Sequence, residues 1–288
     1  MNKRKLLTLA LTLCMVAILA IGGTLAYFTD KDYAKNVMTF GNVEIVQQEH
    51  ERTFDAAGKT TGLKEFTDGK VLLPIVGSAQ GEKDQYGMPV AKNYIDKIVT
   101  VRNEGKSDAW IRTFILMPKN LVNNQNGNLS ESPLHTNLGN RFDETGNGLK
   151  NNMSVNDSLA DWDWVYDSSA AAVGNVTING CVYEVACHTV KAPIVAGDTT
   201  DPVLVGAYLD DNIDFDGTDY VMSTGGHTPT YTKITGIFET GAEDIKIYAY
   251  TQAVQAEGFE TAEAAFTAAG MNETDGKPSI AFLADFEW

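Results

Sequence analysis

The chain has 288 residues, with 22 Lys and Arg against 38 Asp and Glu, which gives a formal net charge of −16. This acidity argues against nucleic acid and anionic membrane surfaces as partners, because like charges repel. The length is enough for one large β domain or two small ones.

The N-terminus has the three parts of a secretory signal peptide. Basic residues at positions 3–5 precede an apolar run at 6–21, and the small residues Thr24 and Ala26 follow it. The apolar run is near the lower limit for a membrane-spanning helix, so a retained anchor is the weaker alternative. We predict cleavage between Ala26 and Tyr27, secretion of the mature chain, and membrane contact only through the signal peptide before cleavage.

Removal of the signal peptide, residues 1–26, makes the chain more acidic, because 19 basic residues remain against 38 acidic ones. This charge suits a soluble extracellular protein and calcium ions. Cys14 is lost with the signal peptide, which leaves Cys181 and Cys187. Six residues apart in an extended segment, these two would lie roughly 20 Å apart, too far for a disulfide. We predict two buried thiols, and a disulfide would require a turn between them.

Most of the mature chain has the alternation and the turn residues of β-strands. Both faces of Ala109–Met117 are apolar, so we expect an interior strand there, and we expect another at Ile245–Val254. The turn at 102–107 predicts a hairpin between the strands on either side of it, and Asn179-Gly180 predicts a two-residue hairpin. Further strands are expected at 39–46, 95–101, 162–166, 176–178, 181–183 and 203–209.

One helix is predicted near the C-terminus, at 259–269, with Thr261 as its N-cap and Gly270 after its end. Residues 118–160 are rich in Asn and Gly and have almost no periodicity, so we expect a loop-rich insertion there. Short strands with turns between them favour an all-β fold, an antiparallel β-sandwich with loop insertions and one short C-terminal helix. This domain is expected to cover residues 38–288.

The residues around the predicted cleavage site, Gly22-Gly23-Thr24-Leu25-Ala26-Tyr27-Phe28-Thr29-Asp30, resemble a particular class of signal peptide. That class is processed by SipW-type signal peptidases of Gram-positive bacteria, and the cargo is the TasA/camelysin family. Three further segments are similar to the framework of this family, at 40–45, 99–112 and 247–255. The resemblance implies a jelly-roll β-sandwich, a SipW-type peptidase as partner, and a secreted structural protein of the cell surface or biofilm extracellular matrix.

The resemblance also implies a role for the first mature residues. In TasA-like proteins the freed N-terminus is thought to act as a donor strand that completes the sheet of the next subunit in a fibre. The matching segment here is 27–37, and its aromatic residues Tyr27, Phe28 and Tyr33 would be the anchors of such self-association. Physically this is the addition of a strand to a sheet edge. A disordered tail is the alternative.

The camelysin name carries a metalloprotease activity, which the sequence does not support. A zinc protease normally has two His one helical turn apart with a Glu beside the first. The four His are far apart, and none begins this pattern: His50, His135, His188 and His227. We therefore predict a protein with no catalytic residues. The alternatives are a camelysin-type secreted metalloendopeptidase and a monomeric surface adhesin or binding module.

A calcium site is the only cofactor site that the sequence suggests. In the acidic run at 210–219, oxygen-bearing side chains alternate before Gly217, as in a calcium loop. The twelfth position of such a loop is Ser223, where calcium loops place a Glu, so a solvated acidic loop is the alternative. The candidate ligands are Asn212, Asp214 and Asp216.

Overall fold

A computed structural model of the chain describes residues 29–32, 43–77, 84, 88–122, 133–138, 162–164, 173–215, 218–224, 230–242, 244–286 and 288. The signal peptide, its cleavage site at Ala26 and Tyr27, and the anchors Phe28 and Tyr33 lie outside these ranges. Cleavage and the roles of these four residues therefore stay predictions.

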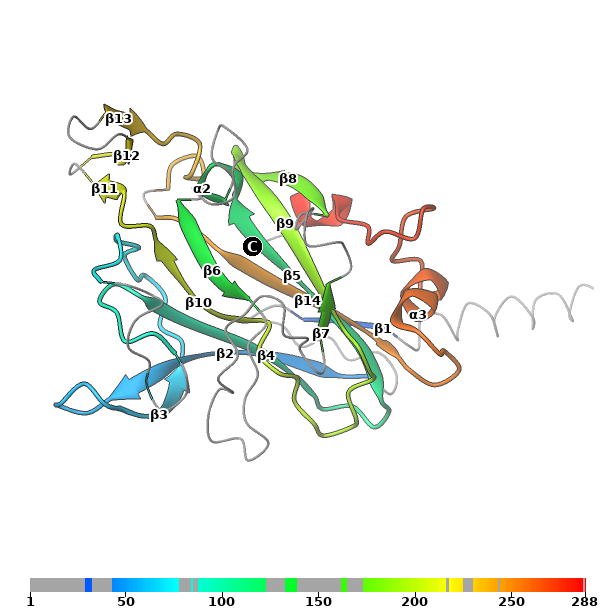
Figure 1. Cartoon of the computed structure of the whole chain (residues 1–288). Helices are drawn as coiled ribbons and strands as arrows, with labels where there is room; N and C mark the ends of the chain where they lie inside the picture. Colours follow the sequence, from blue (N-terminus) through cyan, green and yellow to red (C-terminus); the bar gives the residue numbers. More distant parts are fainter. Residues whose placement is uncertain are drawn as a thin grey trace, which may run out of the picture.

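Within the described residues, two larger antiparallel sheets pack face to face (Figure 1). The six-stranded sheet has the order β1-β14-β5-β9-β7, and β8 also pairs with β9. Its strands are β1 (Thr29–Asp32), β5 (Ala109–Pro118), β7 (Trp162–Trp164), β8 (Gly174–Ile178), β9 (Cys181–Val190) and β14 (Tyr248–Gln255).

The second sheet has five strands in the order β3-β2-β4-β10-β6. They are β2 (Ile45–Phe54), β3 (Thr60–Glu65), β4 (Ile95–Asn103), β6 (Leu134–Leu138) and β10 (Leu204–Leu209). A smaller sheet contains β11 (Ile213–Phe215), β12 (Tyr220–Thr224) and β13 (Thr230–Lys233). The described helices are α2 (Lys119–Val122), α3 (Ala262–Ala268) and the 3-10 helix η3 (Ala281–Ala284).

The chain passes repeatedly from one large sheet to the other, from β4 to β5, from β5 to β6 and from β9 to β10. As a result β1, β14, β5 and β9 are neighbours in one sheet, while β4, β10 and β6 are neighbours in the other. This alternation between two sheets is that of a jelly roll. The all-β, jelly-roll-like sandwich with a short C-terminal helix is therefore confirmed.

The hairpin predicted around the turn at 102–107 is wrong. Strand β4 pairs with β2 and β10, whereas β5 pairs with β14 and β9 in the opposite sheet. Asn103 holds the connection, because its Nδ2 donates to the carbonyls of Ser107 and Ile194, each at 2.9 Å. Strands from distant parts of the chain pair with both edges of β4 and of β5. The residues of the turn therefore could not show that the chain passes from one sheet to the other here.

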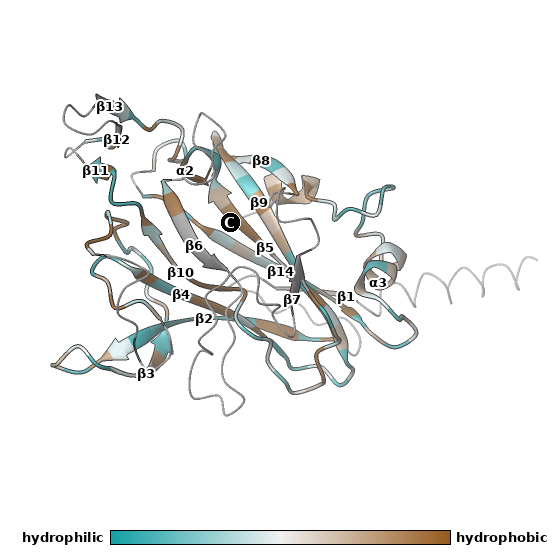
Figure 2. Ribbon diagram, in the orientation of Figure 1, coloured by the Kyte–Doolittle hydropathy of each residue, from teal (hydrophilic) through white to brown (hydrophobic). Residues whose placement is uncertain are grey.

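The main core lies between the two sheets and is filled by aliphatic side chains, which colour the strands brown in Figure 2. Val99 and Val101 come from the five-stranded sheet, and Ile111 and Ile115 come from the six-stranded one. Every residue of β5 is buried, so the interior strand predicted there is confirmed. Strand β14 is also interior, between β1 and β5, but it begins at Tyr248 rather than at Ile245.

Two C-terminal elements pack on the outer face of the six-stranded sheet, where α3 contacts β5 and β14 and η3 contacts β8. Helix α3 places Ala265 and Phe266 against this face, and η3 places Leu283 farther along it. Aromatic rings close the second layer, with Tyr250 lying 5.1 Å from Phe282 between ring centroids. The described sandwich therefore has an apolar layer on each side of its six-stranded sheet.

Several local predictions are confirmed. Thr261 caps α3, because its hydroxyl accepts the backbone N–H of Ala264 at 3.2 Å, and Gly270 follows the helix with φ +69°. Asn179 and Gly180 form the turn between β8 and β9 with positive φ at both positions, as that hairpin requires. Cys181 and Cys187 are buried free thiols on β9.

The range 118–160 contains α2 and β6 among its described residues. Strand β6 pairs with β10 and forms one edge of the five-stranded sheet. This part of the predicted insertion therefore contributes a strand to the sandwich, and the other residues of the range lie outside the described ones.

Candidate functional site

The N-terminal segment that the sequence singled out for assembly contains a strand of the chain's own sheet. Thr29, the third residue of the predicted mature chain, lies opposite Val254, and Asp32 lies opposite Thr251. Strand β1 is thus an edge strand whose only partner among the described strands is β14. In the single chain the described part of 27–37 completes its own sheet, and donation to a neighbour stays a prediction.

Strand β14, which accepts β1, is fixed on its inner face by a buried polar layer. The Thr251 hydroxyl donates to Gln47 Oε1 at 2.8 Å, and Gln47 Nε2 donates to the carbonyl of Ala249 at 3.3 Å. Thr251 Oγ1 also lies 2.9 Å from the hydroxyl of Thr113 on β5. These bonds tie β14 to β2 and to β5, so its position does not depend on β1 alone.

On the outer face, β14 is fixed by the buried side chain of Arg112. Its Nε donates to Gln252 Oε1 at 2.9 Å, and its Nη1 and Nη2 donate to Asn272 Oδ1 at 2.6 Å and to the Met271 carbonyl at 2.8 Å. The guanidinium carbon lies 4.1 Å from the ring centre of Phe266. Arg112 therefore joins β5, β14 and the C-terminal residues.

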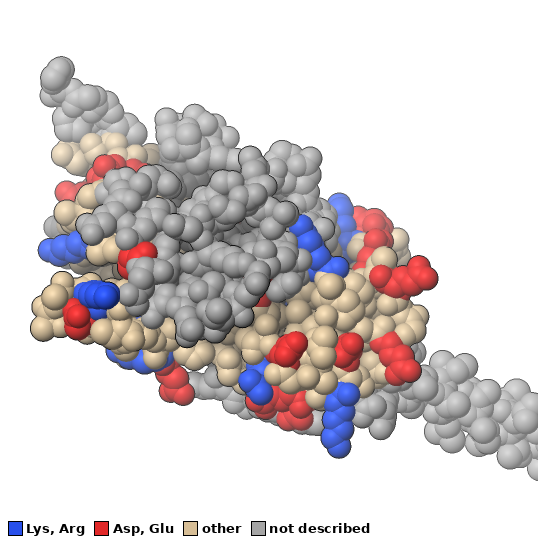
Figure 3. All heavy atoms as spheres, turned by 60° about the horizontal axis from the view of Figure 1, so that its bottom comes forward, with Lys and Arg blue, Asp and Glu red and all other residues tan. Residues whose placement is uncertain are grey.

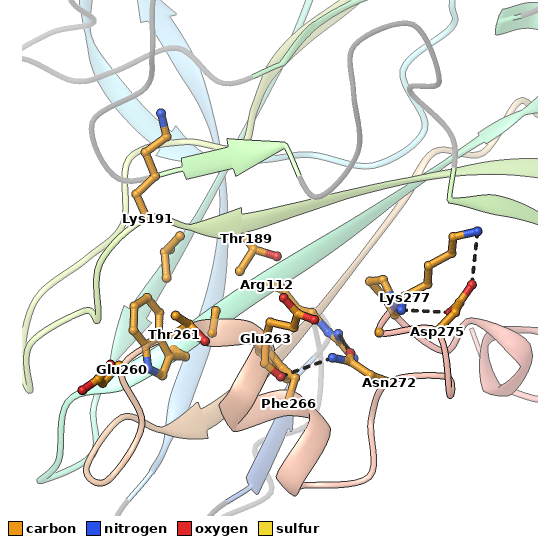
Figure 4. A pocket seen from close by; sticks show the side chains of 15 residues that line it. Arg112, Thr189, Lys191, Glu260, Thr261, Glu263, Phe266, Asn272, Asp275 and Lys277 are labelled. Atoms are coloured by element: carbon orange, nitrogen blue, oxygen red, sulfur yellow. Dashed lines mark hydrogen bonds and ion pairs between the residues drawn. The ribbon is translucent and has the colours of Figure 1, made fainter.

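A pocket opens beside Arg112 on this outer face, and Figure 4 shows Asn272 next to the guanidinium. Its volume is about 560 Å³. It is lined by Trp110, Arg112, Thr189, Val190, Lys191, Glu260, Thr261, Ala262, Glu263, Phe266, Asn272, Asp275, Gly276, Lys277 and Pro278. Sequence analysis missed this pocket, although a charged residue within a strand that is apolar on both faces, as Arg112 is, indicates a buried polar site.

A second buried polar site surrounds Glu239 in the segment before β14. Its carboxylate accepts hydrogen bonds from the hydroxyls of Tyr248 at 2.6 Å and Tyr183 at 3.0 Å, and from Asn179 Nδ2 at 3.0 Å. Burial raises the pKa of Glu239, but these bonds to the charged form outweigh it, so the pKa lies below its usual value. The Glu239 carboxylate thus joins the β8–β9 turn, β9 and β14. Because its lowered pKa disfavours the uptake of a proton, it is a poor general base.

Arg52 carries the third buried polar network, at one end of the five-stranded sheet. It makes a two-pronged ion pair with Asp96, at 2.9 and 2.7 Å, and its Nη1 lies 2.9 Å from Asp84 Oδ2. Burial raises the pKa of Asp84, but hydrogen bonds from Thr60 and Arg52 outweigh it, and the pKa is lowered. The network fastens Asp84, Pro89 and Asp96 to β2, which is a structural role.

The four His do not come together in the described residues. His50 lies on β2, His135 on β6 and His188 on β9, while His227 lies outside the described residues. His188 is fully buried, which lowers its pKa to about 3 and keeps it neutral. No three His, Cys, Asp or Glu in the described ranges lie close enough together to hold a metal ion. The absence of catalysis stays a prediction.

The calcium candidate is only partly within the described residues. Asp214 lies on β11 and is exposed, and its Oδ1 accepts the backbone N–H of Phe215 at 2.8 Å. Asn212 lies in the turn before β11, and Asp216 lies outside the described residues. The described part is thus a strand paired with β12, and the calcium site stays a prediction.

On the face that Figure 3 shows, the described residues form no large patch of one charge. Basic and acidic side chains of the described residues are interspersed there with uncharged ones. In the described ranges, no helix is both long and apolar enough to cross a membrane.

Comparisons with protein-family models, curated proteins and solved structures found no match to this chain. The resemblance to the TasA/camelysin family therefore rests on the sequence segments alone.

Proposed function

We propose that this protein is a secreted, non-enzymatic structural protein of the cell surface or extracellular matrix, which assembles through its N-terminal strand after removal of the signal peptide. The observation that carries the proposal is the pairing of β1 with β14 at the edge of the six-stranded sheet. Strand β1 begins at the third residue of the predicted mature chain, so removal of the signal peptide would leave it close to a free N-terminus.

The same strand can come from a neighbouring chain, because backbone pairing at a sheet edge does not depend on which chain supplies the strand. Ten residues, 33–42, separate β1 from Val43, and such a length spans up to roughly 33 Å when extended. Strands β1 and β2 lie in different sheets, so no tight hairpin ties β1 to its own domain.

The acceptor strand supports the proposal as well. Thr251 and Gln252 are both buried and hydrogen-bonded to side chains outside β1, so β14 keeps its position when β1 leaves. An acceptor that is already ordered loses little entropy when a new strand binds. The runner-up is a camelysin-type secreted metalloendopeptidase. The buried carboxylates of Glu239 and Asp84 do not favour it, because both are hydrogen-bonded as structural anchors.

A disulfide between chains tests the exchange. Asp30 and Ala253 are paired in register, and paired residues of antiparallel strands lie within disulfide range. One chain carries Asp30→Cys and a second carries Ala253→Cys, and the two are mixed under oxidising conditions. We expect a disulfide-linked dimer of the two chains.

The matched control replaces Ala253→Cys with Ala249→Cys, which lies four residues away on the same strand. This chain should not cross-link to the Asp30→Cys chain, because register places Ala249 beyond the end of β1. If neither mixture gives a dimer, or both give equal amounts, strand exchange in this register is wrong.

A further inference from the structure

A second pocket lies between the end of β2 and the residues that lead into β4. The β2–β4 ladder ends at the pair His50 and Ile98, and beyond it the Arg52 backbone N–H donates to the side chain of Asp96, at 3.0 Å. The two segments no longer pair there, where the β2–β3 hairpin extends beyond the sandwich (Figure 1). The pocket has a volume of about 750 Å³, within the usual range for pockets that hold small molecules.

The lining combines apolar side chains with cations, and both kinds are accessible to solvent. Phe54 is 50% exposed and Val90 is 46% exposed, so an apolar ligand can reach both in the free protein. Lys64, Lys70 and Lys92 also line the pocket and are exposed. Single exposed apolar residues are ordinary on a protein surface, but here two of them meet three cations in one hollow.

The carboxylates that line this pocket are already bound within the chain. Both oxygens of Asp96 accept from Arg52, at distances from 2.7 to 3.0 Å. The two oxygens of Glu51 lie 2.8 Å from Lys64 Nζ and 2.6 Å from Lys70 Nζ. A ligand that has to donate hydrogen bonds therefore competes with these contacts.

The lysines carry more positive charge than the chain cancels. Lys64 and Lys70 share the one carboxylate of Glu51, and Lys92 forms no ion pair in the part of the chain that the structure describes. Three positive charges thus stand against one negative charge. An ammonium group has three N–H donors, so even the paired lysines keep donors for a ligand. The charged groups that remain for a ligand are hydrogen-bond donors.

Backbone groups in the walls of the pocket are occupied as well. The Pro89 carbonyl accepts from Arg52 Nη2 at 3.1 Å, and the Lys92 carbonyl accepts from the Val76 N–H at 3.0 Å. An extended peptide that pairs through its backbone would have to displace such bonds. A small ligand held by side chains would not.

We propose that this pocket binds an organic anion with an apolar body, which is a carboxylate or phosphate joined to an alkyl or aryl group. The anionic head accepts hydrogen bonds from the lysines, and these are strengthened by charge. The apolar body packs against Phe54 and Val90 and removes their surface from water. The chain as a whole has a formal net charge of −16, but salt screens charges farther away than about 10 Å. The local lysines therefore decide which charge the pocket accepts.

The test is a titration of the purified protein with octanoate and octyl phosphate, followed by NMR. The methyl signal of Ala91, which lines the pocket and is identified by its loss in Ala91→Ser, should move on binding. At least one of the two anions should bind with a Kd at or below about 1 mM, and added salt should weaken it. 1-Octanol lacks the charge and acetate lacks the apolar body, so each should bind about tenfold more weakly or less.

Two matched double variants distinguish this pocket from the general surface. Val90→Ser with Lys92→Glu should weaken octanoate binding about tenfold, because it removes an apolar contact and reverses a charge. Val195→Ser with Lys106→Glu makes the same replacements at exposed positions outside the pocket, and octanoate binding should be unchanged. All four positions are exposed, so both variants should fold and melt like the unaltered protein.

Three results overturn the proposal. The first is a titration in which neither octanoate nor octyl phosphate moves the Ala91 signal. The second is binding of 1-octanol or acetate as tight as that of octanoate, which would show that the pocket does not require both the charge and the apolar body. The third is equal octanoate binding by the two double variants, since this puts the ligand elsewhere.

Discussion

Thr113 and Thr251 face each other on β5 and β14 at the centre of the main core, with their hydroxyl oxygens 2.9 Å apart. Thr251 in turn donates to Gln47 of the opposite sheet. An otherwise aliphatic core thus contains a polar layer that crosses the sandwich next to the edge where β1 pairs. Buried hydrogen bonds of this kind specify one arrangement of strands, since any other leaves polar groups unpaired.

The substitution Thr251→Val tests this layer. The two side chains have nearly the same shape, but valine lacks the hydroxyl that donates to Gln47 Oε1 and contacts the hydroxyl of Thr113. We expect the free energy of unfolding in urea to fall by about 1–3 kcal/mol. Thr199→Val, at an exposed position, is the matched control and should change it by less than about 0.5 kcal/mol. Equal effects at both positions would show that the polar layer does not stabilise the core.

Arg112→Leu should destabilise the C-terminal covering of the six-stranded sheet. The change removes three hydrogen bonds and leaves the buried side chain of Gln252 without its donor. We expect a loss of at least about 2 kcal/mol in unfolding free energy, together with faster proteolysis of the C-terminal residues. Arg102→Leu removes an exposed arginine near Glu104 and should be nearly neutral. Equal unfolding free energies and equal rates of proteolysis for the two variants would show that Arg112 does not hold the C-terminal residues on the sheet.

We expect His188 to make the fold sensitive to mild acid. Burial lowers its pKa from 6.5 to about 3, so the folded state keeps it neutral while the unfolded state takes up a proton below pH 6.5. The stability is therefore complete above pH 6.5 and is lost as the pH falls from 6.5 towards 3. By linkage the loss between pH 7.5 and 5 is about 2 kcal/mol.

Urea unfolding of the protein and of His188→Gln at pH 7.5, 6 and 5 measures this loss. The variant cannot take up the proton, so its stability should change less over the same range. Glu239 and Asp84 have lowered pKa values and lose their contributions in more acidic solution, below the ordinary carboxyl pKa. Parallel pH profiles for the two proteins would show that His188 is not the acid-sensitive group.

The elements with local signals could be predicted from the sequence. The apolar faces of Ala109–Met117 predicted an interior strand, and Thr261 and Gly270 marked the ends of α3, because burial pattern and capping act over a few residues. The pairings between distant residues could not be predicted. The change of sheet between β4 and β5 depends on partners elsewhere in the chain.

In the candidate sites, too, local features could be predicted and contacts between distant residues could not. A segment near the N-terminus could be singled out, but its pairing with β14 joins residues more than two hundred positions apart. The bond between Arg112 and Asn272 spans 160 positions, and the pocket beside it forms only when the C-terminal residues fold back over the sheet. No short pattern in the sequence encodes either relationship.

Locking β1 into its own sheet tests the central claim most directly. A single chain carrying both Asp30→Cys and Ala253→Cys should form an internal disulfide, because these residues are paired in register. Light scattering and electron microscopy of the oxidised chain should show monomers, and reduction should start assembly, while the unaltered protein should assemble with or without reductant. Assembly of the oxidised, internally linked chain at the rate of the unaltered protein would contradict strand exchange through β1.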